Sequence, residues 1–156
     1  MNMYCGYALN QLKVAIDSIS EVVNQLDNHS LQIRPTTNKY SIGELLAHLV
    51  TICRADYKIA EGASRDEMTA YYSTIKLTSL DEIKDALWSN FTFLEEKFKT
   101  FNDQELQMNM TSYWGTTYSR YEWLLEIVTH VYHHRGQLHS MLIHCCGIYP
   151  DVKLFE

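Results

Sequence analysis

The chain has 156 residues, of which 46% are hydrophobic and 21% charged, and its formal net charge is −6 at pH 7. This length and balance predict a single globular domain over residues 1–156. Nucleic acid is not expected as a partner, because the Lys and Arg residues are scattered and form no basic run that could neutralise phosphates. No run of about 18 apolar residues is present, so no membrane span is expected.

The small number of chain-breaking residues, 2 prolines and 6 glycines, favours a few long helices. Apolar residues at steps of three and four predict a first amphipathic helix over about residues 4–26. A second helix is expected to run from its cap, Ser41, to about residue 60, since Glu44 completes a capping box with that serine. Residues 62–78 then form either a connection or a short helix.

A third helix is predicted to begin with Ser79 or Thr78 as its cap and to continue with a steady apolar stripe. The helical pattern is lost between residues 102 and 119, where alternation is too weak to predict a strand. There, Tyr-Trp-Gly at 113–115 indicates an ordered loop with buried aromatic rings. A fourth helix is predicted over about residues 120–146, closed by a glycine and a nearby proline. Four long amphipathic helices predict an all-α fold, a four-helix bundle.

The histidines that bear on function lie on the apolar faces of two predicted helices. His130 and His134 are one helical turn apart, so they can present two imidazoles to the same point. Such a pair alone is a weak signal, because two hydrogen-bonded core histidines have the same spacing. His48 falls on the apolar side of the second helix, and burying all three imidazoles is costly unless they share a partner. The sequence therefore predicts a divalent-metal site, and three protein ligands with an open position are typical of catalytic metal sites.

Other metal-site motifs fail on spacing. The HExxH motif requires a glutamate where Val131 stands, and di-iron bundles require two Glu-x-x-His pairs that this chain lacks. His133 is expected on the neighbouring helical row, either exposed or next to the ligands. His29 and His144 are expected to be surface or helix-capping residues, and His139 is expected at the surface. The 4 cysteines form no CxxC pair, and free thiols suit a reducing cytoplasm.

Two segments that carry these histidines resemble the DinB/YfiT-like superfamily. They are His130-x-x-x-His134-Arg135-Gly136-Gln137 and the segment from Tyr40 to Leu49. The resemblance covers nearly the whole chain, and it implies a four-helix bundle, often dimeric, whose metal is held by His48, His130 and His134. Arg135 and Gln137 match an HRGQ signature of the superfamily, and packing and salt-bridge roles are expected for both. Tyr40 replaces a tryptophan that often precedes the helix-two serine, a change expected to matter little for the metal.

The resemblance also implies a function, because members with assigned activities are thiol-cofactor enzymes such as bacillithiol transferases and mycothiol-dependent maleylpyruvate isomerase. We expect a metal-dependent enzyme that acts by thiol transfer or by hydrolysis on a small-molecule substrate, with no catalytic residue assigned. The alternative is a non-catalytic or stress-related protein whose metal holds the fold together. An enzyme needs an accessible pocket beside the metal, and Tyr57, Tyr113 and Tyr118 are candidates for its lining.

Zinc or nickel is the expected cofactor, and ligation by imidazoles also admits iron, copper or manganese. A low-molecular-weight thiol is the expected partner of the thiol-transfer reaction. A second copy of the chain is a further expected partner, since Leu46, Val50 and Leu125 lie outside the main apolar stripes and could supply a homodimer interface.

Overall fold

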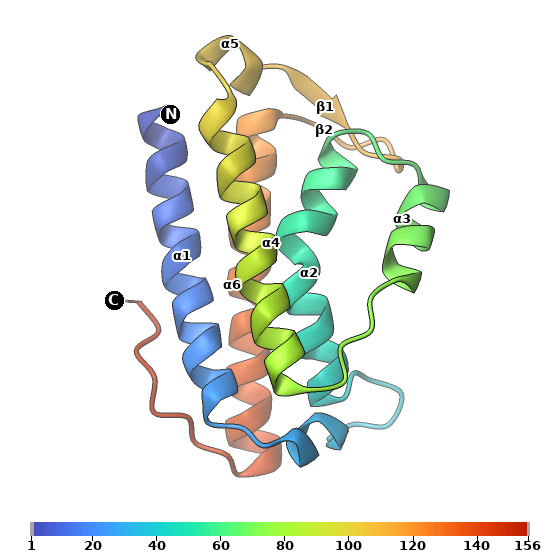
Figure 1. Cartoon of the computed structure of the whole chain (residues 1–156), viewed down its shortest axis with the longest axis vertical. Helices are drawn as coiled ribbons and strands as arrows, with labels where there is room; N and C mark the ends of the chain where they lie inside the picture. The colour runs from blue at the N-terminus through green and yellow to red at the C-terminus, as the bar shows by residue number, and fades with distance from the viewer. Residues whose placement is uncertain (1, 156) are drawn as a thin grey trace.

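The computed structural model describes residues 2–155, in which four long helices run alongside one another (Figure 1). They are α1 (Met3–Asn24), α2 (Ile42–Ala60), α4 (Leu80–Thr100) and α6 (Arg120–Cys146). Both α1 and α2 pack against α4 and α6, so α1 and α2 occupy opposite corners of the helical array. All four helices lie within about two residues of the positions that hydrophobic periodicity predicts. No helix among the described residues has the length and apolar character to cross a membrane.

Side-chain caps fix where most helices begin. Five helices start with a capping box, in which a Ser or Asn accepts a bond from the helix and a glutamate accepts one from the cap residue. The predicted cap Ser41 is confirmed, and Ser79 is the cap of α4. Helix α6 ends at Gly147, whose φ of 65° is left-handed and therefore suits glycine.

Short elements occupy the connections. A 3-10 helix, η1 (Asn28–Gln32), follows α1, and a four-residue helix, α5 (Asp103–Leu106), follows α4. Helix α3 (Arg65–Ser73) lies in the stretch where the sequence predicts either a connection or a short helix, which confirms the second alternative.

A β-hairpin lies where the sequence predicts a loop without strands. Its strands, β1 (Asn109–Thr111) and β2 (Thr117–Ser119), are antiparallel and only three residues long, too short for a visible period-two pattern. The prediction of buried aromatic rings is also wrong, because Tyr113 is 42% and Trp114 is 52% exposed. The two rings pack edge to face at the hairpin tip, with centroids 4.8 Å apart, and Trp114 donates a hydrogen bond to Thr116. The fold is therefore mostly helical, with one small hairpin at the end of the array where α6 begins (Figure 1).

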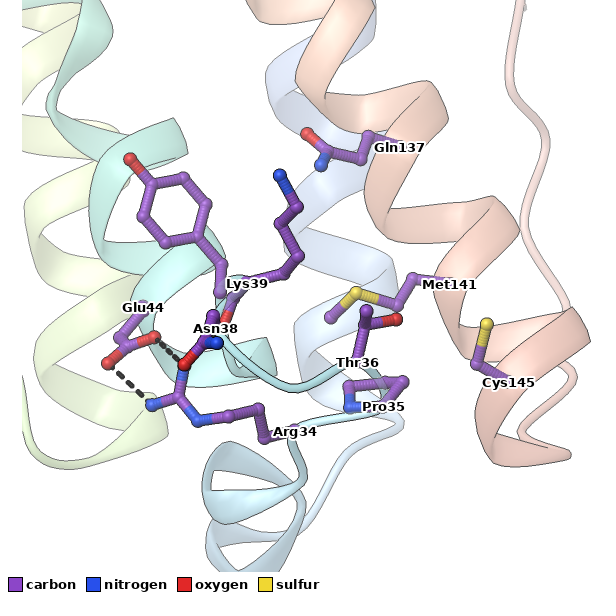
Figure 2. Close-up of a pocket in the computed structure, with 10 residues that line it drawn as sticks. Arg34, Pro35, Thr36, Asn38, Lys39, Glu44, Gln137, Met141 and Cys145 are labelled. Atoms are coloured by element: carbon purple, nitrogen blue, oxygen red, sulfur yellow. Dashed lines mark hydrogen bonds and ion pairs between the residues drawn. The ribbon is translucent and has the colours of Figure 1, made fainter.

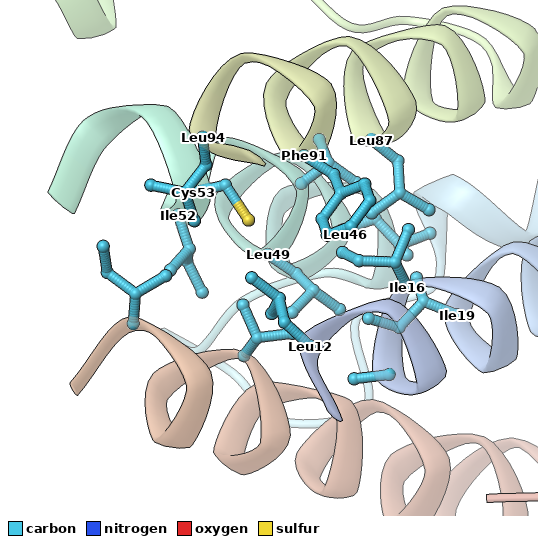
Figure 3. Close-up of a cluster of buried hydrophobic side chains, with 14 of the residues drawn as sticks. Leu12, Ile16, Ile19, Leu46, Leu49, Ile52, Cys53, Leu87, Phe91 and Leu94 are labelled. Atoms are coloured by element: carbon cyan, nitrogen blue, oxygen red, sulfur yellow. The ribbon is translucent and has the colours of Figure 1, made fainter. Parts of the chain in front are cut away.

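All four long helices contribute to the main apolar cluster of the core (Figure 3), and a small second cluster joins Ala55 and Ile59 of α2 to Met68 of α3. The expectation that Leu46 and Val50 point outward is wrong, since both are fully buried. Helix α2 contacts α4, α6 and η1, so most of its circumference is covered. Leu125 is 41% exposed, as expected. All four cysteines are free.

Candidate metal centre

Packing of α2 against α6 brings the three predicted histidines together. The Nε2 atom of His134 lies 3.1 Å from Nε2 of His48 and 3.1 Å from Nε2 of His130. One ring nitrogen from each of the three residues lies within 4.8 Å of the other two. Three imidazole nitrogens about 2.0–2.1 Å from one tetrahedral zinc ion would be roughly 3.3 Å apart, so the spacing found here fits a metal with little adjustment.

Hydrogen bonds on the far side of two rings fix how these imidazoles face. The Nδ1 atom of His130 lies 2.7 Å from a carboxylate oxygen of Asp56, and Nδ1 of His134 lies 2.8 Å from the amide oxygen of Gln137. Both partners are acceptors, so each Nδ1 carries the proton and each Nε2 presents its lone pair to the centre of the cluster. This arrangement, an oxygen acceptor behind a ligating imidazole, is the usual support of a metal-binding histidine.

The electrostatics of the cluster favour neutral imidazole at two of its three positions. Burial, and then repulsion from the neighbouring histidines, lowers the pKa of His48 to about 4. Burial is also the main cause that lowers the pKa of His134. Asp56 raises the pKa of His130 through its hydrogen bond and its charge. His48 and His134 are therefore deprotonated near neutral pH, which is the form that coordinates a metal.

A second group of candidate ligands, Asp56, Glu126 and His130, adjoins the first and shares His130 with it. One carboxylate oxygen of Glu126 is buried and has no hydrogen-bond partner among the described residues, and burial raises the pKa of this carboxyl. The sequence analysis does not identify Asp56 or Glu126 as site residues, although their spacing from the predicted ligands could have indicated them. Asp56 is two helical turns after His48, and Glu126 is four residues before His130, so each shares a helix face with a predicted ligand.

The two residues of the HRGQ signature have different roles. Arg135 is buried and donates hydrogen bonds to the Ser18 hydroxyl and the Leu154 carbonyl, and it lies over the ring of Tyr132. No carboxylate among residues 2–155 pairs with it, so the packing role is confirmed and the salt bridge is not found among these residues. The expectation of a salt bridge is wrong for Gln137, because its amide carries no charge; this side chain accepts a hydrogen bond from the His134 ring instead.

A hollow of about 760 Å³, whose lining residues are drawn in Figure 2, adjoins two residues that contact the imidazole cluster. It is bordered by Gln137, which bonds to His134, and by Tyr40, whose ring centroid is 6.1 Å from that of His48. The tyrosines predicted to line a pocket do not border this hollow. Tyr57 packs against two phenylalanines, and Tyr118 packs against Trp123.

The remaining histidines stay outside the cluster. His133 is exposed, with its ring centroid 4.8 Å from that of His134, as its place on the neighbouring helical row predicts. His29 and His144 are also exposed, and His139 is half-buried on α6. None of these three belongs to a group of candidate metal ligands among the described residues.

The fold and the site together define a class of protein, a helical protein in which two packed helices hold a candidate divalent-metal centre of three histidines. The chain is a member of the DinB family, whose sequence model matches residues 2–147. A solved protein assigned to the DinB family, from Exiguobacterium sibiricum 255-15, is similar with a TM-score of 0.84 and 29% identity, over 99% of this chain and 97% of that protein.

Two further solved structures are similar in fold. A DinB-like protein of Bacillus cereus ATCC 10987 has a TM-score of 0.70 at 19% identity, over 94% of this chain and 95% of that one. A DinB-like protein of Bacillus subtilis has a TM-score of 0.72 at 13% identity, over 96% and 97%. No curated protein matches the chain.

Proposed function

We propose that the protein is a divalent-metal-dependent enzyme, built as one domain on a four-helix bundle, whose metal is held by His48, His130 and His134. The observation that carries this proposal is the convergence of the three Nε2 atoms, with the two closest pairs 3.1 Å apart. Asp56 and Gln137 support the proposal, since each accepts a bond from the far nitrogen of a ligand ring. Zinc or nickel is the metal we expect there, although imidazole ligation also suits iron and copper, and manganese is a further candidate.

An enzymatic role is favoured over a purely structural metal for two reasons. The ligand set is incomplete, and a hollow lies next to Gln137 and Tyr40, which contact two of the ligands. A structural zinc site is closed by four protein ligands, whereas three ligands leave a position for a reactant. A divalent metal bound there would lower the pKa of a thiol or a water molecule and so provide a nucleophile near neutral pH. The chain's own part is to orient the imidazoles through Asp56 and Gln137 and to receive a small molecule in the adjacent hollow. Thiol transfer and hydrolysis are the two reactions that this chemistry serves.

The ligand assignment is tested by metal content. Purified protein and single variants would be loaded with zinc, dialysed and analysed by elemental spectrometry. His48→Ala and His130→Ala are expected to lose stoichiometric metal, because two imidazoles remain in each. His133→Ala and His144→Ala are matched controls from α6 and should retain the metal. Full occupancy in the His48→Ala protein would remove the assignment.

The reaction class is tested on cobalt-substituted protein. A small thiol that coordinates the metal should produce a sulfur-to-cobalt charge-transfer band, and His134→Ala should lose that band. Turnover of esters or amides without any effect of thiols would favour hydrolysis. If no thiol binds and no substrate turns over, the alternative of a structural metal in a non-catalytic or stress-related protein replaces the enzyme.

We also propose that the protein acts in the cytoplasm as a homodimer. Exposed apolar side chains on the adjacent helices α1 and α6 support this, among them Tyr4, Tyr7 and Leu125. A second copy of the chain is the partner that a symmetric interface of this kind would bind.

A further inference from the structure

The hollow beside the imidazole cluster has a defined order along α6 (Figure 2). Gln137, which bonds to His134, marks its inner end, and Met141 and Cys145 follow at one-turn intervals. At 1.5 Å per helical residue, Met141 lies about 6 Å and Cys145 about 12 Å farther from the cluster than Gln137 along the helix axis. A molecule in the hollow therefore has one end beside the imidazoles and the other end away from them.

The inner end carries positive charge. The hollow is lined by two cations, Arg34 and Lys39, and by one carboxylate, that of Glu44. Arg34 and Glu44 bind each other through two hydrogen bonds of 2.8 Å, so their charges are mutually compensated. The ammonium group of Lys39 has no carboxylate partner among the described residues, and Figure 2 shows its side chain extended toward Gln137. One uncompensated cation therefore faces this hollow in a protein whose net charge is −6.

Gln137 adds a hydrogen-bond donor to that cation. Its amide oxygen is engaged with His134, which leaves its amide nitrogen, a donor of two protons, for the hollow. The nearby amide groups at the start of α2 are already satisfied, since Ser41 and Glu44 cap them. One ammonium and one amide match the single charge and two oxygens of a carboxylate. A phosphate dianion would keep one charge without a partner.

The outer end offers mainly apolar contacts along α6. Met141 and Pro35 line it together with the exposed Cys145, and Thr36 adds one hydroxyl beside Met141 (Figure 2). A thioether, a pyrrolidine ring and a thiol offer contacts for an aliphatic chain and carry no charge. The hollow thus joins a cationic end next to the imidazoles with an apolar end remote from them.

We propose that the hollow binds an aliphatic carboxylate, with the carboxylate between Lys39 and Gln137 and the chain lying along Met141. This inference rests on the proposed function only for the reaction of the bound carboxylate at the metal. Its binding uses residues outside the imidazole cluster and does not depend on the metal. The orientation also restricts the substrate class. Since the carboxylate lies at the inner end, the group that reacts at the metal is attached close to that carboxylate.

The binding is tested without metal, by NMR of protein labelled with carbon-13 on its methionine methyl groups. The Met141 signal would be assigned with Met141→Leu and followed during titration with hexanoate, butanoate, hexanamide and inorganic phosphate. Hexanoate should shift it saturably, and butanoate should bind more weakly, by roughly two- to four-fold for each methylene group removed from the apolar wall. Hexanamide, which lacks the charge, should bind about two- to five-fold more weakly than hexanoate.

Lys39→Met should raise the Kd for hexanoate about two- to five-fold and abolish the preference for hexanoate over hexanamide. Lys84→Met is the matched control, because Lys84 lies on α4, outside the hollow, and should leave the Kd unchanged. Equal binding of hexanamide and hexanoate, or tighter binding of phosphate, would overturn the proposal. So would an unchanged Kd in Lys39→Met.

A second arm repeats the titration after loading with zinc, which should tighten hexanoate binding because a cation is added next to the carboxylate. No tightening in zinc-loaded protein would overturn the orientation of the carboxylate. If zinc does not bind at all, the proposed metal centre fails while the metal-free titration still decides whether the hollow takes a carboxylate. The two failures are therefore distinguishable.

Discussion

Asp56 offers a sharp test of the metal centre, because it touches the cluster without being one of its proposed ligands. Its side chain is only 12% exposed, and its carboxylate lies 2.7 Å from Nδ1 of His130. The negative charge holds the ring proton on Nδ1 and leaves the Nε2 lone pair facing His134. In Asp56→Asn the shape is kept but the charge is lost, and the amide can rotate to present its NH₂ group. That rotation favours the opposite tautomer of His130, with a proton on Nε2 that must leave before a metal can bind.

Replacement of such an acceptor behind a ligating histidine costs about 10- to 100-fold in metal affinity, which is roughly 1.4–2.7 kcal/mol. The zinc Kd of Asp56→Asn would be measured by competition with a chromophoric chelator. Asp85→Asn is the control for charge, because Asp85 is an exposed residue of α4. Circular dichroism would verify that both variants are folded. A zinc Kd in Asp56→Asn within about two-fold of the unchanged protein would refute the argument that Asp56 orients His130.

Further outcomes follow from the same contacts. Zinc affinity should fall as the pH is lowered from about 7 to 5, because Asp56 raises the pKa of His130 and a proton then competes with the metal for this ring. Calorimetric titrations that show constant zinc affinity over this pH range would contradict the expectation. Arg135→Met should lower the free energy of unfolding in urea by about 1.5–3 kcal/mol and leave zinc affinity intact, since its hydrogen bonds hold the C-terminal segment. Leu49→Ala should cost about 2–5 kcal/mol in the same assay, against less than about 0.5 kcal/mol for the exposed Leu125→Ala. Light scattering should give twice the mass of one chain, and a monomer at micromolar concentration would exclude the dimer.

Hydrophobic periodicity predicts the long helices well because each of them buries a continuous apolar face. It also places His48 on the buried side of α2 and His130 with His134 on that of α6, so packing of these helices is sufficient to bring the three imidazoles together. The burial of Leu46 is not predictable in this way, because it depends on how many neighbours cover α2. The periodicity of apolar residues identifies the one buried face of a helix, and it does not indicate how many neighbouring helices cover the other faces.

The supporting residues are harder to predict because their roles arise from contacts between elements. Asp56 shares a helix face with His48, but its partner His130 lies 74 positions later in the chain. Lys39 precedes α2 in a loop with no pattern of its own, and only the fold places it opposite Gln137. The β-hairpin is missed for a different reason, since its strands are stabilised by pairing with each other and bury little apolar surface.

The loop that carries Lys39 and the helix that carries His48 are joined by one set of bonds. Glu44, in the first turn of α2, accepts a bond from the Ser41 amide and binds Arg34, and Arg34 also donates to the carbonyl of Lys39. Arg34 and the Ser41 amide together hold the pKa of the Glu44 carboxyl at about 2, so this carboxylate stays charged across the range in which a metal binds. The cap that starts the helix therefore also fixes the loop beside the hollow. In consequence, one network of bonds links the backbone of Lys39 to the first turn of the helix that carries His48.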